Sequence, residues 1–430
     1  MEIRSNVLSF GAKGDGVTKD TQAIQKALDA GGVVHFPAGT YLTGTIYLRS
    51  NGGIDLAPGA VILGSPDLAD YNSDDFCPQN IVFKRESVTG AHLVVAVEQQ
   101  NIVITGHGRI DGNRQAFYTP ETDRSKIWST ELTRPGQMVY LCECEDVAIT
   151  GVELFNAPYW TCFLHGCEHV QIQGVHIFNH MHTRNGDGID LDCCRFVTVS
   201  DCRIDCGDDC ITLRGNNRPL KKPRPCEYIT ITNCILRTIC NAFRIGVGNG
   251  LVRSATISNC IIFDSRNAIT LCSKYSQENG VGIEDISFSN IRIDAIKPFV
   301  IVINAHGHKE GPAIQPIRNI SFNQVRGRCK EASVIVGEKP GDISEITFND
   351  VVLDYYGGET VRTDITDFTE VSGRSAPAAF WCAFADDVHF NACGINWDKE
   401  AVNWQYDIIA HDCANLTATN CRFTKGIDNK

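Results

Sequence analysis

The chain has 430 residues, of which 43% are apolar and 21% are charged, and its formal net charge is −12. This composition excludes a disordered, collagen-like or long coiled-coil protein, and no apolar run approaches the roughly 20 residues that cross a bilayer. The negative charge argues against nucleic acid and against anionic membranes as partners. The same negative charge would repel an anionic polymer substrate, unless basic residues gather around the site that binds it.

The 20 cysteines are many for a chain whose first residues do not resemble a secretory signal. Residues 1–6 contain neither the basic nor the apolar segment of a signal peptide. We therefore expect a cytoplasmic protein whose cysteines are mostly reduced. No Cys-x-x-Cys pair of the zinc type is present; the nearest groupings are Cys142 with Cys144, and the adjacent Cys193 and Cys194.

The first predicted element is an amphipathic helix over residues 18–31. Its apolar residues recur at helical spacing, and Gly31 follows its end. A helix at this position is suited to cover the first coil of a repeat protein. The apolar face consists of Ala23, Ile24, Ala27 and Leu28.

A short β-rich pattern then recurs along the chain, and each copy ends at Gly, Asn, Asp or Gln. Apolar and polar residues alternate within each copy, as in a half-buried strand. From the first copy to the ninth, the end positions lie 23 to 45 residues apart. The copies end at Gly106, Gly151, Gly174, Asp201, Asn233, Asn259, Asn290, Gln324, Asp350 and Asn420.

One strand per copy predicts a solenoid rather than a propeller, because a propeller blade needs about four strands in ~40–45 residues. Tight turns rather than helices separate the strands, so we predict an all-β protein, a parallel β-helix with coils about 4.8 Å apart. The whole chain, 1–430, is then a single domain with a cap at about residues 1–50. Residues 113–135 carry no repeat, and we expect them to protrude as a loop.

Several cysteines directly follow the end positions of the repeats. In a β-helix they would point into the coil interior one above another, as small buried apolar groups. We favour this stack over disulfides or a metal site. The four residues are Cys202, Cys234, Cys260 and Cys421.

The densest acidic region consists of two motifs, Asn-Gly-Asp-Gly-Ile-Asp-Leu-Asp at 185–192 and Gly-Asp-Asp-Cys-Ile-Thr-Leu-Arg at 207–214. Asp187 precedes Asp208 and Asp209 by 21 and 22 residues, close to one coil. A β-helix would therefore bring these carboxylates side by side, and one of them should hold a proton near neutral pH. A protonated acid beside an ionised base is the pair that glycoside hydrolysis requires.

Two other interpretations of these motifs remain open. Gly-Asp and Asp-Asp also form ordinary turns, although two acidic motifs one coil apart favour a site. The second alternative is a metal site. Its ligands would be His180, His182, Asp187, Asp190 and Asp192.

Four segments resemble glycoside hydrolase family 28, the polygalacturonases and their relatives. The first two are residues 10–25 and residues 32–41, which read Gly-Val-Val-His-Phe-Pro-Ala-Gly-Thr-Tyr. Residues 185–190 are similar to the family's Asn-Thr-Asp-Gly-x-Asp, and residues 207–211 to its Gly/Gln-Asp-Asp-Cys/Ala motif. The resemblance covers residues 6 to 295, with the motifs in the family's order and at its spacing.

This resemblance implies a right-handed parallel β-helix that hydrolyses pectic polymers with inversion, without a cofactor or metal. Asp208 matches the general acid, and Asp187 and Asp209 match the pair that positions and deprotonates water. Inversion asks for carboxyl groups ~6.5–9.5 Å apart, which adjacent coils can provide. The expected partner is an oligosaccharide, and the oligomeric state stays open.

Two family motifs are altered in this chain. The usual Gly-His-Gly is absent, and Asn241 takes the place of the histidine, or Cys240 if the match shifts by one residue. The family's Arg-Ile-Lys, which grips the substrate carboxylate and ring, aligns with Thr270 and Cys272 in place of the two basic residues. We therefore expect a non-standard subsite specificity.

Other residues near the altered motifs are candidates for binding substrate. Arg214 and Arg244 could contact a uronate carboxylate or pair with the acids. Besides Asn241 and Thr270, His182 and Asn185 are expected to line the cleft, and Tyr275 could stack on a sugar ring. The leading prediction is an inverting glycosidase of pectin-derived or related oligosaccharides. A catalytically silent carbohydrate-binding β-helix and a lyase or epimerase on the same scaffold are the alternatives.

Overall fold

The computed structural model describes residues 5–120, 127–361 and 376–429. They form short strands joined by turns, and the one α-helix among them is α1 (Thr21–Asp29). The chain divides into two compact units, which are described separately. Residues 1–211 with 217–224 form the first unit, and residues 212–216 with 225–430 form the second. The expectation of a single domain over 1–430 stays a prediction. None of the helices in these ranges is long and apolar enough to cross a membrane.

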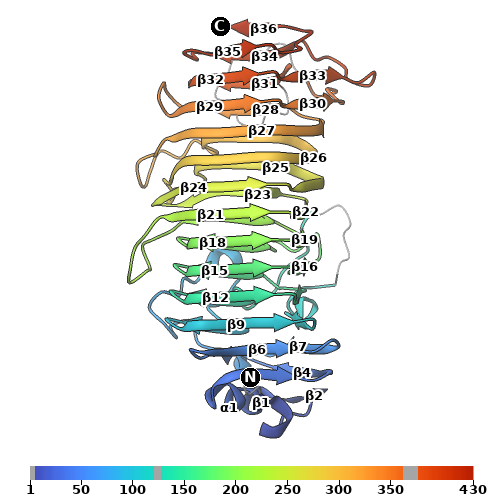
Figure 1. Ribbon diagram of the computed structural model, residues 1–430, viewed down its shortest axis with the longest axis vertical. Coiled ribbons are helices and arrows are strands. Elements are labelled where there is room, and N and C mark those ends of the chain that lie inside the picture. Colours follow the sequence, from blue (N-terminus) through green and yellow to red (C-terminus); the bar gives the residue numbers. More distant parts are fainter. Residues whose placement is uncertain (1–4, 121–126, 362–375, 430) are drawn as a thin grey trace. The chain divides into compact units, whose positions relative to one another are not determined.

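The first unit is a right-handed parallel β-helix, as predicted, and its strands stack into three sheets that we call A, B and C (Figure 1). In Figure 1, β9, β12, β15 and β18 lie one above another and point the same way. Sheet A contains β1 (Ser5–Asn6), β3 (Gly32–Phe36), β6 (Gly52–Leu56), β9 (Gln100–Gly106), β12 (Glu145–Thr150), β15 (Glu168–Gln173) and β18 (Arg195–Ser200). Sheet B contains β2 (Asp15–Lys19), β4 (Gly39–Thr43), β7 (Ala60–Gly64), β10 (Arg109–Asp111), β13 (Glu153–Phe155), β16 (His176–Phe178) and β19 (Arg203–Cys206). Sheet C contains β5 (Ile46–Tyr47), β8 (Val94–Val97), β11 (Val139–Cys142), β14 (Cys162–His165) and β17 (Ile189–Asp192).

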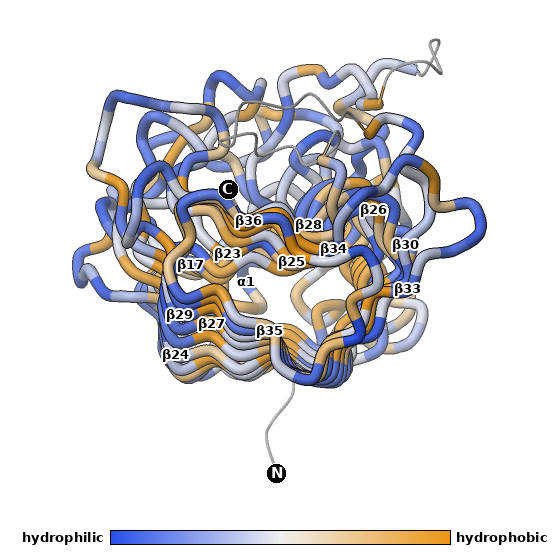
Figure 2. The backbone as a smooth tube through the Cα atoms, turned by 90° about the horizontal axis from the view of Figure 1, so that it is seen from above, coloured by the Kyte–Doolittle hydropathy of each residue, from blue (hydrophilic) through white to orange (hydrophobic). Residues whose placement is uncertain are grey.

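The second unit repeats this architecture in sheets that we call D, E and F, and its long strands β25 and β26 bend from one sheet into the next. Figure 2 shows β24, β27 and β29 nearly superimposed, so equivalent residues of successive coils lie above one another. Sheet D contains β21 (Cys226–Thr232), β24 (Leu251–Ser258), β26 (Gly282–Asn304), β27 (Ile317–Cys329), β29 (Ile343–Asn349), β32 (Ala385–Asn391) and β35 (Thr417–Thr419). Sheet E contains β22 (Ile235–Thr238), β25 (Ile261–Lys274), parts of β26 and β27, β30 (Val352–Tyr355) and β33 (Gly394–Trp397). Sheet F contains β20 (Ile211–Gly215), β23 (Asn241–Gly248), parts of β25 and β26, β28 (Ser333–Val336), β31 (Ala378–Ala383), β34 (Tyr406–His411) and β36 (Ile427–Asn429).

The residues that end the sequence repeats share one backbone conformation. Asp201, Asn233, Asn259 and Asn290 have φ between 51° and 59°, and Gly151 has φ of 72°. A left-handed residue turns the chain sharply after a strand, and Gly, Asn and Asp tolerate it best. Gly, Asn and Asp therefore recur at these positions because the sharp turn at each corner of a coil requires a residue that tolerates a left-handed backbone.

Helix α1 covers the start of the first unit, as the sequence predicts. Ile24, Ala27 and Leu28 are buried. The side-chain amide of Gln25 donates to the carbonyl oxygen of Tyr47 at 3.1 Å and so attaches the helix to β5. Four short 3-10 helices lie in the connections: η1 (Val7–Phe10), η2 (Leu68–Asp70), η3 (Lys84–Glu86) and η4 (Arg114–Phe117).

Equivalent side chains stack along the second unit. The rings of Phe288 and Phe322 lie 5.2 Å apart, and those of Phe322 and Phe348 lie 4.9 Å apart, each pair nearly parallel. A second column is polar: Asn349 donates to Asn323 at 2.8 Å, and Asn391 donates to Asn349 at 2.9 Å. The columns follow from the parallel register, which places each residue beside its counterpart one coil away.

The cysteines form no disulfide: all 20 are free thiols, and 16 are buried. A hydrogen bond to Cys234, together with burial, raises the pKa of Cys260, so these two predicted members do stack. Cys421 instead contacts Cys393, where burial raises the pKa of the Cys393 thiol to about 12. The expected stack therefore exists as separate short columns.

The segment 113–135 is only partly described. Its two ends pack into the first unit, where Phe117 and Arg134 are buried. Tyr118 pairs with Glu131 in an isolated antiparallel bridge. Residues 121–126 lie outside the described residues, so the predicted protrusion of this loop stays a prediction.

Candidate active site

Asp187 and Asp209 occupy equivalent positions on two successive coils of the first unit. The backbone N–H of Gly188 donates to the carbonyl oxygen of Asp209 at 2.8 Å, and that of Ile189 donates to Cys210 at 2.9 Å. These bonds of a parallel ladder set Asp187 beside Asp209, at the strand spacing of about 4.8 Å. Their separation of 22 residues in the sequence is therefore one coil.

Asp208 joins this pair through the turn that precedes Asp187. Asn185 has a φ of 53°, and its backbone N–H donates to Oδ2 of Asp208 at 3.2 Å. Asp187 is 4% exposed, whereas Asp208 and Asp209 are half-buried. Three carboxyl groups therefore lie at neighbouring turns of two successive coils, and that of Asp187 is almost completely buried. That one of the three holds a proton near neutral pH stays a prediction.

A fully buried arginine, Arg134, holds the turn that carries Asn185. Its guanidinium donates to groups from four segments of the first unit, so it fixes the approach of the chain to Asp187. Its acceptors are the carbonyl oxygens of Pro158 and Arg184 at 2.7 Å, that of Glu86 at 3.2 Å, Oδ1 of Asn185 at 3.3 Å, and the Tyr118 hydroxyl.

Tyr159 packs against this arginine and lies near enough to Asp187 for that charge to affect its pKa. The Arg134 guanidinium is 4.9 Å from the centre of its ring, and its hydroxyl donates to the carboxylate of Glu86. Burial raises the pKa of Tyr159 well above its ordinary value, and the charge of Glu86 and then that of Asp187 add to the effect. Tyr159 is therefore a neutral donor at any physiological pH.

His182 is exposed and is held by the loop of residues 127–135. Its Nδ1 donates to the carbonyl oxygen of Ile127 at 2.6 Å, and its own carbonyl oxygen accepts from Ser129 at 2.9 Å. The neighbouring Thr183 accepts a hydrogen bond of 2.5 Å from Nε of Arg114. The predicted role of His182 toward a substrate stays a prediction, because these contacts only fix its position.

The alternative of a metal site built from His180, His182 and three aspartates finds no support in the described part of the chain. The potential ligand atoms that cluster there do not combine these five residues. Asp192 lies instead with His165 and Cys193, whose ligand atoms are within 4.8 Å of one another. The register of β14 and β17 explains the difference, since it pairs His165 with Asp192.

The other predicted binding residues belong to the second unit, on sheet F. Arg214, Asn241, Arg244 and Thr270 are all buried, and the register of β23 and β25 pairs Arg244 with Thr270. Oδ1 of Asn241 accepts from Thr270 at 2.7 Å and from Asn267 at 2.8 Å. The Asn241 amide also donates to the Cys240 sulfur at 3.3 Å, so both residues proposed for the missing histidine lie together.

The outer face of sheet C is covered by aromatic side chains from the connection between β7 and β8. Tyr140 and Phe163 are neighbours in the register of β11 and β14, with ring centres 5.8 Å apart. The His92 ring stacks on Tyr140 at 4.3 Å, and Phe83 lies 5.2 Å from Trp160. We call the following six residues the aromatic cover: Phe76, Phe83, His92, Tyr140, Trp160 and Phe163.

The aromatic cover ends beside the acidic cluster. Trp160 is 5% exposed, and the N–H of the next residue, Thr161, donates to the carbonyl oxygen of Asp187 at 3.0 Å. Phe163 pairs with Asp190 across β14 and β17. On the N-terminal side of Asp187, the outer face of sheet C is therefore covered by side chains of the aromatic cover.

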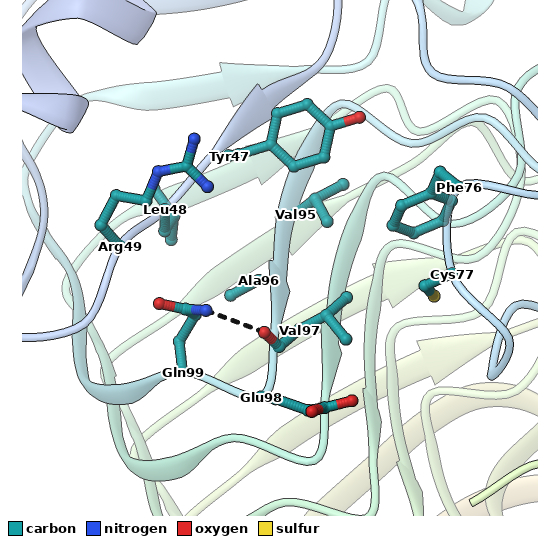
Figure 3. A pocket seen from close by; sticks show the side chains of 10 residues that line it. All are labelled: Tyr47, Leu48, Arg49, Phe76, Cys77, Val95, Ala96, Val97, Glu98 and Gln99. Carbon is teal, nitrogen blue, oxygen red and sulfur yellow. Dashed lines mark hydrogen bonds between the residues drawn. The ribbon is translucent and has the colours of Figure 1, made fainter.

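A pocket of about 430 Å³ lies on the side of the aromatic cover away from Asp187, over β5 and β8 (Figure 3). Figure 3 shows Tyr47, Phe76, Val95 and Val97 around it, with Gln99 bonded to the Val97 carbonyl oxygen at 2.9 Å. None of the predicted site residues lines this pocket.

Sequence reasoning missed Arg134, Tyr159 and the aromatic cover apart from Trp160, for which the sequence favours packing under a loop over stacking on a sugar ring. Arg134 lies 51 residues before Asn185 and belongs to no repeat or motif, so spacing gives no signal for it. The aromatic residues look like ordinary core positions in the sequence. Only the fold shows that they lie on the outside of sheet C.

Comparison with known proteins is consistent with this geometry. Residues 78–375 match the family described as glycosyl hydrolases family 28, and residues 4–131 match the family described as rhamnogalacturonase A/epimerase, pectate lyase-like. The chain is 27% identical to an exo-poly-alpha-D-galacturonosidase of Dickeya chrysanthemi, over 87% of this chain and 72% of that protein.

Two solved structures share the fold. A family 28 exopolygalacturonase of Yersinia enterocolitica superposes with a TM-score of 0.66 at 19% identity, covering 99% of this chain and 77% of that one. A hyperthermoactive exopolygalacturonase of Thermotoga maritima gives a TM-score of 0.63 at 21% identity, covering 82% and 87%. The family match spans most of the chain and includes both acidic motifs; the chain therefore belongs to glycosyl hydrolases family 28 and is a glycosidase.

Proposed function

We propose that this glycosidase hydrolyses galacturonic acid-containing oligosaccharides of pectin with inversion at the anomeric carbon. The proposal rests on one observation above all: Asp187 and Asp209 lie side by side on successive coils, with Asp208 bonded to the same turn. The names of the relatives, an exo-poly-alpha-D-galacturonosidase and two exopolygalacturonases, supply the substrate class.

In the proposed reaction Asp208 donates its proton to the glycosidic oxygen, and the bond from the anomeric carbon to that oxygen breaks. Asp187 and Asp209 hold a water molecule on the opposite face of the sugar and take its proton as its oxygen bonds to the anomeric carbon. One proton is given and one is taken, so after each turnover Asp208 regains a proton and the Asp187 and Asp209 pair loses one, by exchange with water, before the next cycle. No cofactor enters this scheme.

We further propose that the enzyme acts from chain ends. The aromatic cover fills the outer face of sheet C beside Asp187, where a polymer bound in mid-chain would need room. A chain end, in contrast, needs space on one side of the cleaved bond only. This proposal agrees with the exo activity in the names of the relatives.

The test follows hydrolysis of polygalacturonate and of short galacturonate oligosaccharides, with absorbance at 235 nm to detect unsaturated products. New reducing ends that disappear in Asp208→Asn, with NMR showing the β-anomer as the first product released from the α-linked chain, would support the proposal. Viscosity that falls only in proportion to reducing ends would support exo action, and an early collapse of viscosity would contradict it. Unsaturated products would indicate a lyase, and binding without turnover would indicate a silent carbohydrate-binding protein.

The predicted cytoplasmic location is kept as a proposal. The free state of all 20 cysteines suits a reducing compartment. Short imported oligosaccharides would then be the natural substrates, and cell fractionation of the native host would test this. Recovery of the protein from the culture medium would overturn it.

A further inference from the structure

Arg244 is a buried cation that has no acidic partner among the described residues of the second unit. Its side chain is 4% exposed. Nη1 donates to the carbonyl oxygen of Ile245 at 3.1 Å, and the guanidinium lies 5.3 Å from the centre of the Tyr275 ring. The remaining neighbour is the thiol of Cys272, whose pKa is raised by burial and partly lowered again by Arg244. Nη2 is buried and has no hydrogen-bond acceptor among the described residues.

Other arginines of the same unit show how this chain ordinarily treats such a charge. Arg253 pairs with Glu227 at 2.7 Å, and Arg318 pairs with Glu284 at 2.6 Å. A guanidinium stays protonated in proteins, so it cannot lose its charge when it is buried. A buried charge without a counter-ion is strongly unfavourable. The arrangement around Arg244 is therefore one that an external anion would complete.

Further basic groups accompany Arg244 in the second unit. Burial lowers the pKa of His306, and the charges of His308 and Arg244 lower it further, so these groups lie near one another. Lys274 is 3% exposed, and its Nζ donates to the carbonyl oxygen of Pro312 at 2.8 Å. Lys274 lies four residues beyond Thr270 on β25, so both side chains face the same side of sheet F as Arg244.

A flat apolar surface and an unused acceptor accompany these cations. The Tyr275 ring is 51% exposed, and the His306 ring meets it edge-on at 5.3 Å. On the other side of Thr270, Oδ1 of Asn267 is buried without a hydrogen-bond donor in the described ranges. A ligand that suits this group of residues carries an anion, a ring with a face of C–H groups that can pack on an aromatic side chain, and a hydroxyl donor. A uronic acid has all three.

We propose that Arg244, Tyr275 and Asn267 form a binding site for an acidic sugar, with Arg244 taking its carboxylate. The sugar ring packs on Tyr275, and one of its hydroxyl groups donates to Asn267. The inference rests on the proposed function, which makes galacturonate the sugar. It also resolves the absence of basic residues at Thr270 and Cys272: the cation stands one strand away, directly beside Thr270 in the register.

The proposal predicts recognition of the carboxylate itself, so the probe is trigalacturonate compared with its fully methyl-esterified form. Binding is measured by calorimetry in Asp208→Asn, which is expected to stop hydrolysis without touching this site. We expect Arg244→Gln in that background to weaken trigalacturonate binding by roughly 30-fold or more, the usual loss for one partner of a buried charge pair. Binding of the methyl ester should change little.

Two controls separate this site from a structural role. Arg253→Gln removes a partly exposed, paired arginine of the same unit and should leave both affinities unchanged. Thermal unfolding of Arg244→Gln should occur at the wild-type temperature or above, because an uncompensated buried charge is removed. A structural arginine would instead lower that temperature.

The outcomes distinguish this site from the catalytic proposal. Hydrolysis of galacturonate chains together with an unchanged carboxylate preference in Arg244→Gln would overturn the site and leave the function intact. Loss of that preference in a protein that hydrolyses none of the substrates would support the site and reject the function. Equal binding of acid and ester by the Arg244-containing protein, or no binding of either, would also overturn the site.

Discussion

Replacing Arg134 by methionine tests whether the acidic turn depends on this buried arginine. Methionine fills much of the same volume but removes five donated hydrogen bonds, two of them at 2.7 Å. Each buried acceptor that is left unsatisfied costs about 1–3 kcal/mol. If only three of the five acceptors remain without a donor, the free energy of unfolding falls by about 3 kcal/mol. The upper bound is about 5 kcal/mol, the largest loss usual when a buried charged interaction is broken.

This loss has a thermal and a kinetic signature. For a unit of 150–250 residues, each kcal/mol lowers Tm by about 2–4 °C, so we expect Tm to fall by about 6–20 °C in calorimetry or circular dichroism. At a temperature where the variant is folded, kcat on trigalacturonate should fall by about 100-fold, since Arg134 no longer holds Asn185 beside Asp208. Arg134→Lys keeps the charge with fewer donors, so its Tm and kcat should lie between those of the wild-type protein and those of Arg134→Met.

The matched control is Arg49→Met, which removes an exposed arginine of the same unit whose ion-pair partner, Asp29, is exposed as well, and it should cost at most about 1 kcal/mol. The reasoning would be refuted by an Arg134→Met protein with the wild-type Tm and kcat. A lower Tm with an unchanged kcat would show that Arg134 supports the fold but not the acidic turn.

Three further predictions concern the acid, the stacked core and the corners. Asp208→Asn should lower kcat by at least about 1,000-fold with unchanged circular dichroism, and near-normal activity would remove Asp208 from the acid role. Phe322→Ala should lower the free energy of unfolding in urea by about 3–5 kcal/mol, because the ring is fully buried between two others; a loss under 1 kcal/mol would mean that the column contributes little. Asn259→Val should cost about 1–3 kcal/mol and Asn259→Gly almost nothing, because φ is 55° there; equal losses in urea unfolding would argue against the corner as the cause.

The sequence was sufficient to predict the β-helix because its cause is local and repeated. Each coil ends in a residue such as Asn259 that tolerates the left-handed corner, and the strand before it alternates apolar and polar residues. The same regularity converts the 22-residue spacing of Asp187 and Asp209 into neighbouring positions. Local residue preferences and the repeat length are therefore sufficient to predict the β-helix and the position of the acidic cluster.

The remaining features depend on contacts that no repeat length encodes. Arg134 reaches Asn185 across 51 residues from an irregular segment, and Phe76 reaches Tyr140 from a connection without regular strands. Arg244 was recognised as a basic residue near the altered motifs. That it is buried with no acidic partner among the described residues depends on its neighbours in other strands, and these follow only from the register.

The stacked columns also determine how such a protein can change over evolutionary time. Asn349 bonds to Asn323 on one side and to Asn391 on the other, so its environment is set by two residues 26 and 42 positions away. A single replacement within the column breaks two bonds at once, whereas the loops between columns can lengthen without disturbing any of them. Substitutions in the strands should therefore occur together in all residues of a column, whereas those in the connections should occur independently. The coils of one protein constrain one another's sequences, much as subunits do in a filament.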